Sequence, residues 1–153
     1  MGFVAPTPRV LSLKDPTSKM SKSAPDQNSR ILLTDPSDRI KAKIRGAVTD
    51  STVGITYDPE GRPGAANLLT ILAACTGENV EEVAARYHDK GHGHLKADVT
   101  EAVEEMLKGP RADFERLKNE TEYLDEIART GAAQARELSE ATMRQVRATL
   151  GLV

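Results

Sequence analysis

Two lysines stand three positions apart in the stretch KDPTSKMSKSAPD, which runs from Lys14 to Asp26. Prolines and serines surround Lys19 and Lys22, so the local sequence predicts a loop rather than a helix or a strand. A lysine ammonium is a compact charge on a flexible stem, and two of them on a loop that opens and closes can follow phosphate groups during a reaction. The alternative is a solvated linker, and the elements around the loop distinguish the two.

Those elements fall into two regions that differ in composition and in the spacing of their apolar residues. Residues 1–35 are rich in proline, and we expect a short apolar strand over residues 10–13 that leads into the lysine loop. From residue 36 onward, apolar residues recur at helical spacing. Asp35 is expected to cap the first helix, with Pro36 as its first residue. Further helices are expected over residues 65–76, 80–87, 95–107, 110–117 and 121–150, with a break at Gly109-Pro110.

The predicted fold class is therefore mainly α, a helical bundle preceded by one strand and the lysine loop. A lone strand can neither satisfy its backbone hydrogen bonds nor bury a face. We expect its partner strands to belong to an α/β domain that is otherwise missing from this chain.

Composition limits the classes of function. Apolar residues make up 39% and charged residues 29%, and the net charge of −2 argues against a uniformly basic nucleic-acid binder while leaving room for a local basic face. A single cysteine, Cys75, excludes an internal disulfide and fits a reducing cytosol. No apolar run reaches the ~20 residues of a membrane span. The expectation is a cytoplasmic protein that does not enter a membrane.

The sequence KMSKS at residues 19–23 matches the signature loop of class I aminoacyl-tRNA synthetases letter for letter. Its flank, PRVLSLKDPTSKMSKS, resembles the tryptophanyl-tRNA synthetase family. The resemblance continues along the chain in AVTDS at 47–51, YDPEGRPGAANLL at 57–69, YHDKGHG at 87–93 and YLDEIARTGAAQARELSEATM at 123–143.

This resemblance implies a ligase that activates tryptophan with ATP and Mg²⁺ and transfers it to its cognate tRNA. Residues 1–35 would be the remnant of a Rossmann-type catalytic domain, and residues 36–153 the helical domain on the anticodon side. The family forms homodimers largely through its other half. The H-x-G-H stretch of the family and its tryptophan pocket are absent here, so this chain alone is expected to be inactive.

The resemblance also implies roles for individual residues. Lys19 and Lys22 would be catalytic, with Lys22 the more important in the transition state. Ala24 departs from the family, which often carries aspartate there. The ATP-binding residues would be Val10, Lys19, Met20, Ser21, Lys22 and Ser23.

A basic stretch in the first predicted helix is a candidate tRNA contact. Lysine and arginine side chains bind the phosphate backbone without reading sequence, although such charges more often form a solvated face. The candidates are Lys41, Lys43 and Arg45.

The histidine-rich stretch HDKGHGH could in principle hold a metal. Structural zinc usually takes four ligands, commonly with cysteines, and three histidines in a glycine-broken loop make a poor closed site. We expect no metal at His88, His92 and His94.

Two rival functions remain open. One is a stand-alone tRNA-binding or regulatory module that has lost catalysis, which would have no use for phosphate-binding lysines. The other is a tyrosine-specific relative of the same synthetases. The AVTDS segment and the closing helix favour specificity for tryptophan over tyrosine.

Overall fold

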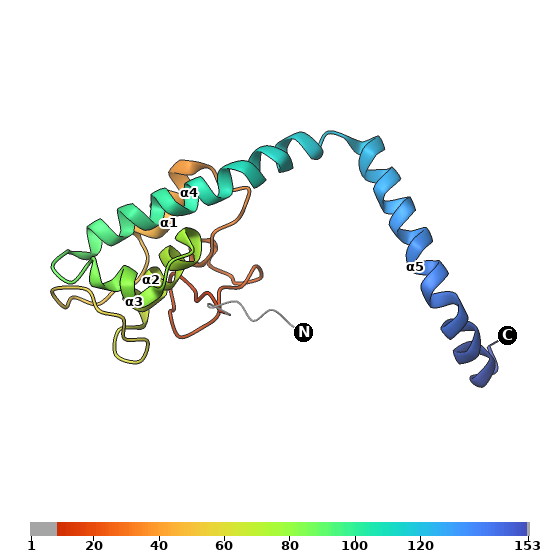
Figure 1. The fold of residues 1–153 in the computed structure, drawn as a ribbon, viewed down its shortest axis with the longest axis horizontal. Helices are drawn as coiled ribbons and strands as arrows, with labels where there is room; N and C mark the ends of the chain where they lie inside the picture. The colour runs from red at the N-terminus through yellow and green to blue at the C-terminus, as the bar shows by residue number, and fades with distance from the viewer. Residues whose placement is uncertain (1–8, 153) are drawn as a thin grey trace. The chain divides into compact units, whose positions relative to one another are not determined.

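The computed structural model describes residues 9–152 and is mainly helical (Figure 1). Residues 1–8 and residue 153 lie outside the described residues. The first of these ranges includes Pro8, the first residue of the stretch PRVLSLKDPTSKMSKS. The chain divides into two compact units, of which the first extends to Arg111 and the second begins at Ala112. The helices are η1 (Gln27–Ser29), α1 (Ser37–Arg45), α2 (Pro63–Thr76), α3 (Val80–Ala85), α4 (His92–Leu117) and α5 (Thr121–Thr149).

Helix α2 forms the centre of the first unit because nearly every one of its residues is apolar or small. Its residues from Gly64 to Leu69 are all buried. Pro63 occupies the first turn, where the missing N–H has no partner to lose. Gly77 ends the helix at φ 74°, a left-handed conformation that favours glycine. The core adds apolar side chains from the other elements: Leu13, Ile40, Ile44, Ile55, Val83, Leu95, Val99 and Val103.

The start of α1 differs from the sequence prediction. Pro36 is the N-cap residue rather than the first helical residue, and no side chain caps the helix. The carboxylate of Asp35 instead accepts hydrogen bonds from the backbone N–H of Leu32 and from the ammonium of Lys43. The predicted cap is therefore wrong, because a buried lysine competes for the same carboxylate.

The predicted strand over residues 10–13 is also wrong for the described part of the chain, which contains only one isolated antiparallel bridge, between Leu11 and Lys19. Residues 9–152 offer no neighbouring strand that would extend the ladder. The backbone bonds of this segment go elsewhere: Leu13 N–H donates to Ser29, and Val48 N–H donates to the Leu13 carbonyl. The segment packs against the helical core through buried Leu13 and half-buried Val10.

Helix α4 runs without the break predicted at Gly109-Pro110. Proline removes one donor, so the carbonyl four residues earlier loses its helical partner. Three buried apolar side chains on one face, Leu95, Val99 and Val103, stabilise the helix before this point. The predicted pair of helices is a single element.

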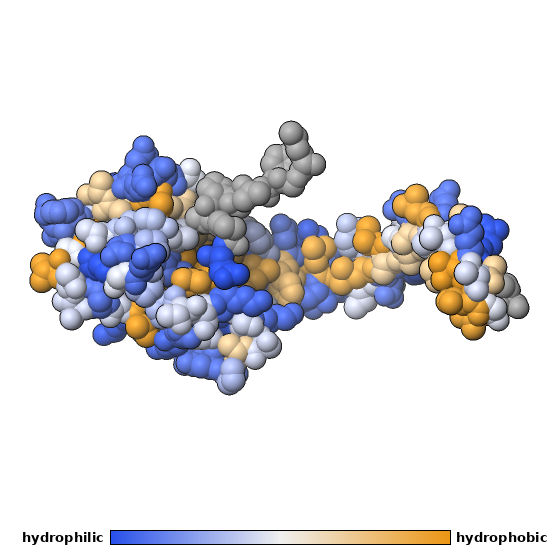
Figure 2. Space-filling model, turned by 90° about the horizontal axis from the view of Figure 1, so that it is seen from below, coloured by the Kyte–Doolittle hydropathy of each residue, from blue (hydrophilic) through white to orange (hydrophobic). Residues whose placement is uncertain are grey.

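The second unit consists of the end of α4 and all of α5. Helix α5 contains Gly131 without interruption and has no buried residue. Its exposed apolar side chains include Ile127, Leu138 and Val146, and apolar surface is visible as orange at the right-hand end of Figure 2. Among the described residues, no helix combines the length and apolarity needed to cross a bilayer.

Candidate functional site

The lysine loop begins at a short antiparallel contact. Met20 N–H donates to the Val10 carbonyl over 3.0 Å, and Ser12 N–H donates to the Ser18 carbonyl over 2.9 Å. These two bonds flank the pair Leu11 and Lys19. The N–H of Met20 is therefore already engaged, and Met20 also packs partly against the core. Residues Val10 and Met20 form the base of the loop, not its tip.

Asp15 organises the near side of the loop. Its carboxylate accepts hydrogen bonds from the hydroxyls of Ser18 and Thr17, at 2.5 and 2.6 Å, and from the N–H of Thr17. The bond from Ser18, followed by those from Thr17, lowers the pKa of Asp15 below its usual range. The carboxylate is thus charged at neutral pH and closes the turn before Lys19.

The far side of the loop is anchored through the backbone. Arg30 donates from one guanidinium nitrogen to the Ala24 carbonyl at 2.8 Å and to the Asp26 carbonyl at 3.3 Å. The hydroxyls of Ser21 and Ser23 lie 3.2 Å apart. Because the anchor at residue 24 is a carbonyl, alanine supplies it as well as aspartate would.

Lys19 and Lys22 are exposed between these two anchors. In residues 9–152, neither ammonium has a salt-bridge or hydrogen-bond partner. By contrast, the neighbouring Lys14 donates to the Gly46 carbonyl at 2.6 Å. The arrangement presents two uncommitted cations on a loop whose ends are fixed, which suits an anionic ligand.

A second cationic surface lies in a groove of about 510 Å³ between α1 and α4. Lys41 and Arg45 of α1 are exposed there, and Lys96 of α4 joins them. The ammonium of Lys96 donates to the carbonyls of Arg45 and Ala47, at 3.2 and 2.8 Å. Burial, and then the charge of Lys14, lower the pKa of Lys96. Sequence reasoning missed Lys96, because nothing in its local sequence marks it as a neighbour of α1.

Lys43 does not belong to this surface. Its side chain is 1% exposed and its ammonium lies 2.5 Å from an Asp35 carboxylate oxygen. The helical turn places Lys41 and Arg45 on a different face from buried Ile40, Lys43 and Ile44. In this structure Lys43 cannot contact a phosphate without breaking its ion pair.

The three histidines do not converge. His88 is exposed beside Asp89, whereas His92 lies 3.7 Å from an Asp50 oxygen and 3.5 Å from Arg62. Among the described residues there is no group of three or more potential metal-ligating side chains. His92 instead borders a loop closed by Arg62.

Arg62 stabilises the loop that joins α1 to α2 through hydrogen bonds to several of its residues. It donates two hydrogen bonds to the Asp50 carboxylate, at 2.7 and 3.0 Å, and further bonds to the carbonyls of Thr52 and Gly54. The bond from Arg62 lowers the pKa of Asp50 far below its usual range, although burial opposes the shift. The AVTDS and GRPG segments thus have a structural role, because Asp50 of the first and Arg62 of the second form one ion pair.

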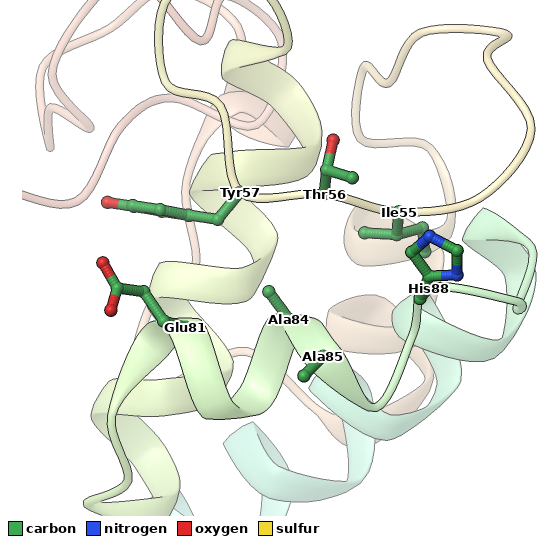
Figure 3. Close-up of a pocket in the computed structure, with 7 residues that line it drawn as sticks. All are labelled: Ile55, Thr56, Tyr57, Glu81, Ala84, Ala85 and His88. Carbon is green, nitrogen blue, oxygen red and sulfur yellow. The ribbon is translucent and has the colours of Figure 1, made fainter.

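Another cavity, of about 270 Å³, lies between this loop and α3 (Figure 3). Ile55, Ala84 and Ala85 supply apolar surface, and Tyr57 and Glu81 lie together on one side, away from His88. The acidic first turn of α3 borders it. This cavity therefore suits a polyanion less well than the groove beside α1 does.

Comparison with known proteins gives consistent results. Residues 2–108 match the family model described as tRNA synthetases class I (W and Y). Tryptophan–tRNA ligases of Bacillus anthracis and Enterococcus faecalis are 41% and 42% identical over 144 residues, which is 94% of this chain. The crystal structure of tryptophanyl-tRNA synthetase from Mycoplasma pneumoniae superposes with a TM-score of 0.80 at 32% identity, over 95% of this chain and 46% of that one.

A further relative carries bound ligands. The Campylobacter jejuni tryptophanyl-tRNA synthetase, solved with ADP and tryptophan, matches 94% of this chain at 27% identity with a TM-score of 0.68. The chain spans 44% of the Bacillus anthracis relative and 43% of the Enterococcus faecalis one. The similarity therefore covers nearly all of this chain and less than half of each relative.

Proposed function

The chain belongs to the class I tRNA synthetases of the tryptophan and tyrosine group, and we propose from this that it is the C-terminal part of a tryptophan–tRNA ligase. The ligase would activate tryptophan with ATP and transfer it to the tryptophan tRNA in the cytoplasm. One observation carries the proposal: Lys19 and Lys22 are exposed, uncommitted cations on a loop anchored at both ends.

The chemistry explains why two such lysines are needed. The tryptophan carboxylate attacks the α-phosphorus of ATP, the bond to the bridging oxygen breaks, and pyrophosphate leaves. Negative charge on the phosphates shifts toward the leaving group in the transition state, and fixed cations stabilise it. Lys22, near the loop's exposed turn, would contact the leaving phosphates, and Lys19 would assist from the base of the loop.

The remaining loop residues would bind and orient the nucleotide. Ser23 is exposed and Ser21 half-buried, and their hydroxyls would bind the phosphates. Val10 and Met20 would contribute through backbone and side-chain contacts at the loop base. Mg²⁺ would arrive with the ATP phosphates and add further charge stabilisation.

The groove between α1 and α4 would contact the tRNA backbone. Lys41 and Arg45 are exposed there, and backbone phosphates are bound by such side chains without base reading. Lys43 is left out of this proposal because it is buried with Asp35. Dimerisation would involve the part of the ligase that this chain does not contain.

The test of the lysine loop is Lys22→Ala in the full-length ligase. We expect tryptophan activation to slow by about 10²-fold or more, because one transition-state charge contact of this kind is worth roughly 3 kcal/mol. Pre-steady-state activation rates and the ATP dissociation constant are measured together. Lys108→Ala, at an exposed position of α4, is the control.

An effect confined to the ATP dissociation constant would mean that Lys22 binds ATP equally in the ground and transition states. That outcome refutes the transition-state role. The rival function is a tRNA-binding module without catalysis. It predicts equal tRNA binding by Lys22→Ala and Lys108→Ala, and no tryptophan-dependent activation by either variant.

A further inference from the structure

The backbone of residues 10–12 makes hydrogen bonds on both sides of the segment. In an extended segment successive peptide groups point in opposite directions. The Val10 carbonyl and the Ser12 N–H bond to the loop residues Met20 and Ser18. The N–H and carbonyl of Leu11 itself therefore face away from the lysine loop.

Both of these groups bond to one side chain. Leu11 N–H donates to Oδ1 of Asn67 at 2.9 Å, and Nδ2 of Asn67 donates to the Leu11 carbonyl at 3.0 Å. A primary amide offers an acceptor and a donor side by side, so it pairs with Leu11 much as a neighbouring strand would. Asn67 replaces the sheet partner that this segment lacks within the described residues.

The location of Asn67 makes this pairing unusual. It is 4% exposed, in a helix whose other buried residues are glycine, alanine, leucine and isoleucine. Burying an amide among apolar side chains is unfavourable unless its hydrogen bonds are made. Packing alone would favour leucine at this position, so the amide has a role beyond filling space.

We propose that Asn67 is a positioning residue for the nucleotide: by fixing Leu11, it sets the place of Val10 and, across the Leu11–Lys19 bridge, of Lys19. The inference rests on the proposed function of the lysine loop. Asn67 would not touch ATP. It would align the loop base with the ATP phosphates through a buried helix that is otherwise remote from the chemistry.

Other contacts should keep the segment folded when Asn67 is removed. Lys14 bonds to the Gly46 carbonyl, and Val48 N–H bonds to the Leu13 carbonyl at 2.8 Å. The loss of Asn67 should therefore loosen the loop base locally. This makes positioning separable from general stability.

The kinetic test compares Asn67→Ala with Leu72→Ala in the full-length ligase, with rates normalised by active-site titration. Leu72 is 3% exposed in the same helix and packs in the core. We expect Asn67→Ala to raise the KM for ATP about tenfold and leave the KM for tryptophan unchanged, because misplacing a positioned group weakens its contacts. Leu72→Ala should lower the melting temperature without changing either KM of the folded fraction.

Asn67→Asp gives a second, nearly isosteric variant. A carboxylate can still accept from Leu11 N–H, but its other oxygen would face the Leu11 carbonyl without a proton between them. We expect this variant to match Asn67→Ala in the KM for ATP. Wild-type KM values for ATP in both Asn67 variants would overturn the proposal.

Amide hydrogen exchange provides a readout independent of activity. Asn67→Ala should speed exchange of the Leu11 amide by about tenfold or more while the Val48 amide stays protected. Unchanged Leu11 exchange would overturn the proposal even if Lys22→Ala slows activation as expected. If Lys22→Ala itself has no effect, the proposed function fails, whatever Leu11 does.

Discussion

At the scale of single residues, alternate lysines of α1 have different roles. Lys41 is exposed beside the groove, whereas Lys43 is buried against the Asp35 carboxylate, which also accepts from the N–H of Leu32. Burial opposes ionisation of Asp35, but the bonds from Lys43 and Leu32 outweigh it and lower the pKa of the carboxyl. The pair fixes the start of α1 to the turn before it.

Substituting these two lysines should separate stability from tRNA binding. Lys43→Ala leaves a buried carboxylate without its partner and should reduce the free energy of unfolding by about 3 kcal/mol. Lys41→Ala should change it by less than about 0.5 kcal/mol. Urea unfolding of the two variants measures both values.

Lys41→Ala, together with Arg45→Ala, also tests the groove. Lys41→Ala should weaken tRNA binding and reduce the slope of log affinity against log salt by about one, as expected for one lost phosphate contact. Binding is measured by fluorescence anisotropy over a range of salt concentrations. An unchanged slope for both Lys41→Ala and Arg45→Ala would rule out the groove as a phosphate site.

At the scale of elements, close backbone contact determines where α2 can lie. A Cβ atom added to Gly64 would overlap the Val48 carbonyl, which belongs to the chain following α1. Gly93 is the second residue of α4, as Gly64 is of α2, but a Cβ atom added to it would meet no neighbour within 4 Å. The two glycines occupy the same position in their helices, and only one of them is required by packing.

Replacing each glycine by alanine should therefore have opposite effects. Gly64→Ala forces backbone to move and should destabilise the protein by about 1–3 kcal/mol. Gly93→Ala meets no neighbour and should stabilise it by about 0.5 kcal/mol through reduced freedom of the unfolded chain. Thermal unfolding of both variants decides this. Equal destabilisation by both would show that helix position, not the Val48 contact, matters.

At the scale of the whole molecule, the first unit joins the lysine loop to the helical core, and the second carries the apolar surface of α5. The contacts of Lys14, Leu13 and Leu11 with residues after α1 and within α2 make the loop base part of that core. A loop anchored in this way can move at its tip while its ends stay in place.

The 153-residue chain by itself should show no tryptophan-dependent exchange of pyrophosphate into ATP. The relatives are more than twice as long as the matched region, and bringing tryptophan, ATP and both phosphate-binding stretches together supplies much of such a rate. The assay uses the purified chain, alone and with a separately produced N-terminal half. Activity from the chain alone would mean that a complete active site lies within these residues.

The sequence by itself identified candidate residues for the chemistry and determined where most helices lie. KMSKS is a local string, and the apolar spacing of α2, α3 and α5 is a local pattern, so both can be read without knowing the fold. The family resemblance rested on the same local strings. For the same reason the sequence could not show that α4 continues through Pro110, where packing of the preceding turns outweighs a local helix breaker.

Only the tertiary structure decided which polar groups meet. Lys41 and Lys43 look alike in sequence, and only the fold shows that Asp35 buries one of them. Leu11 and Asn67 are 56 positions apart, and no local pattern links a strand-like backbone to an amide on a distant helix. The expected strand failed because strand pairing is a property of neighbours rather than of the segment itself. Here the partner of the Leu11 backbone is the side chain of Asn67.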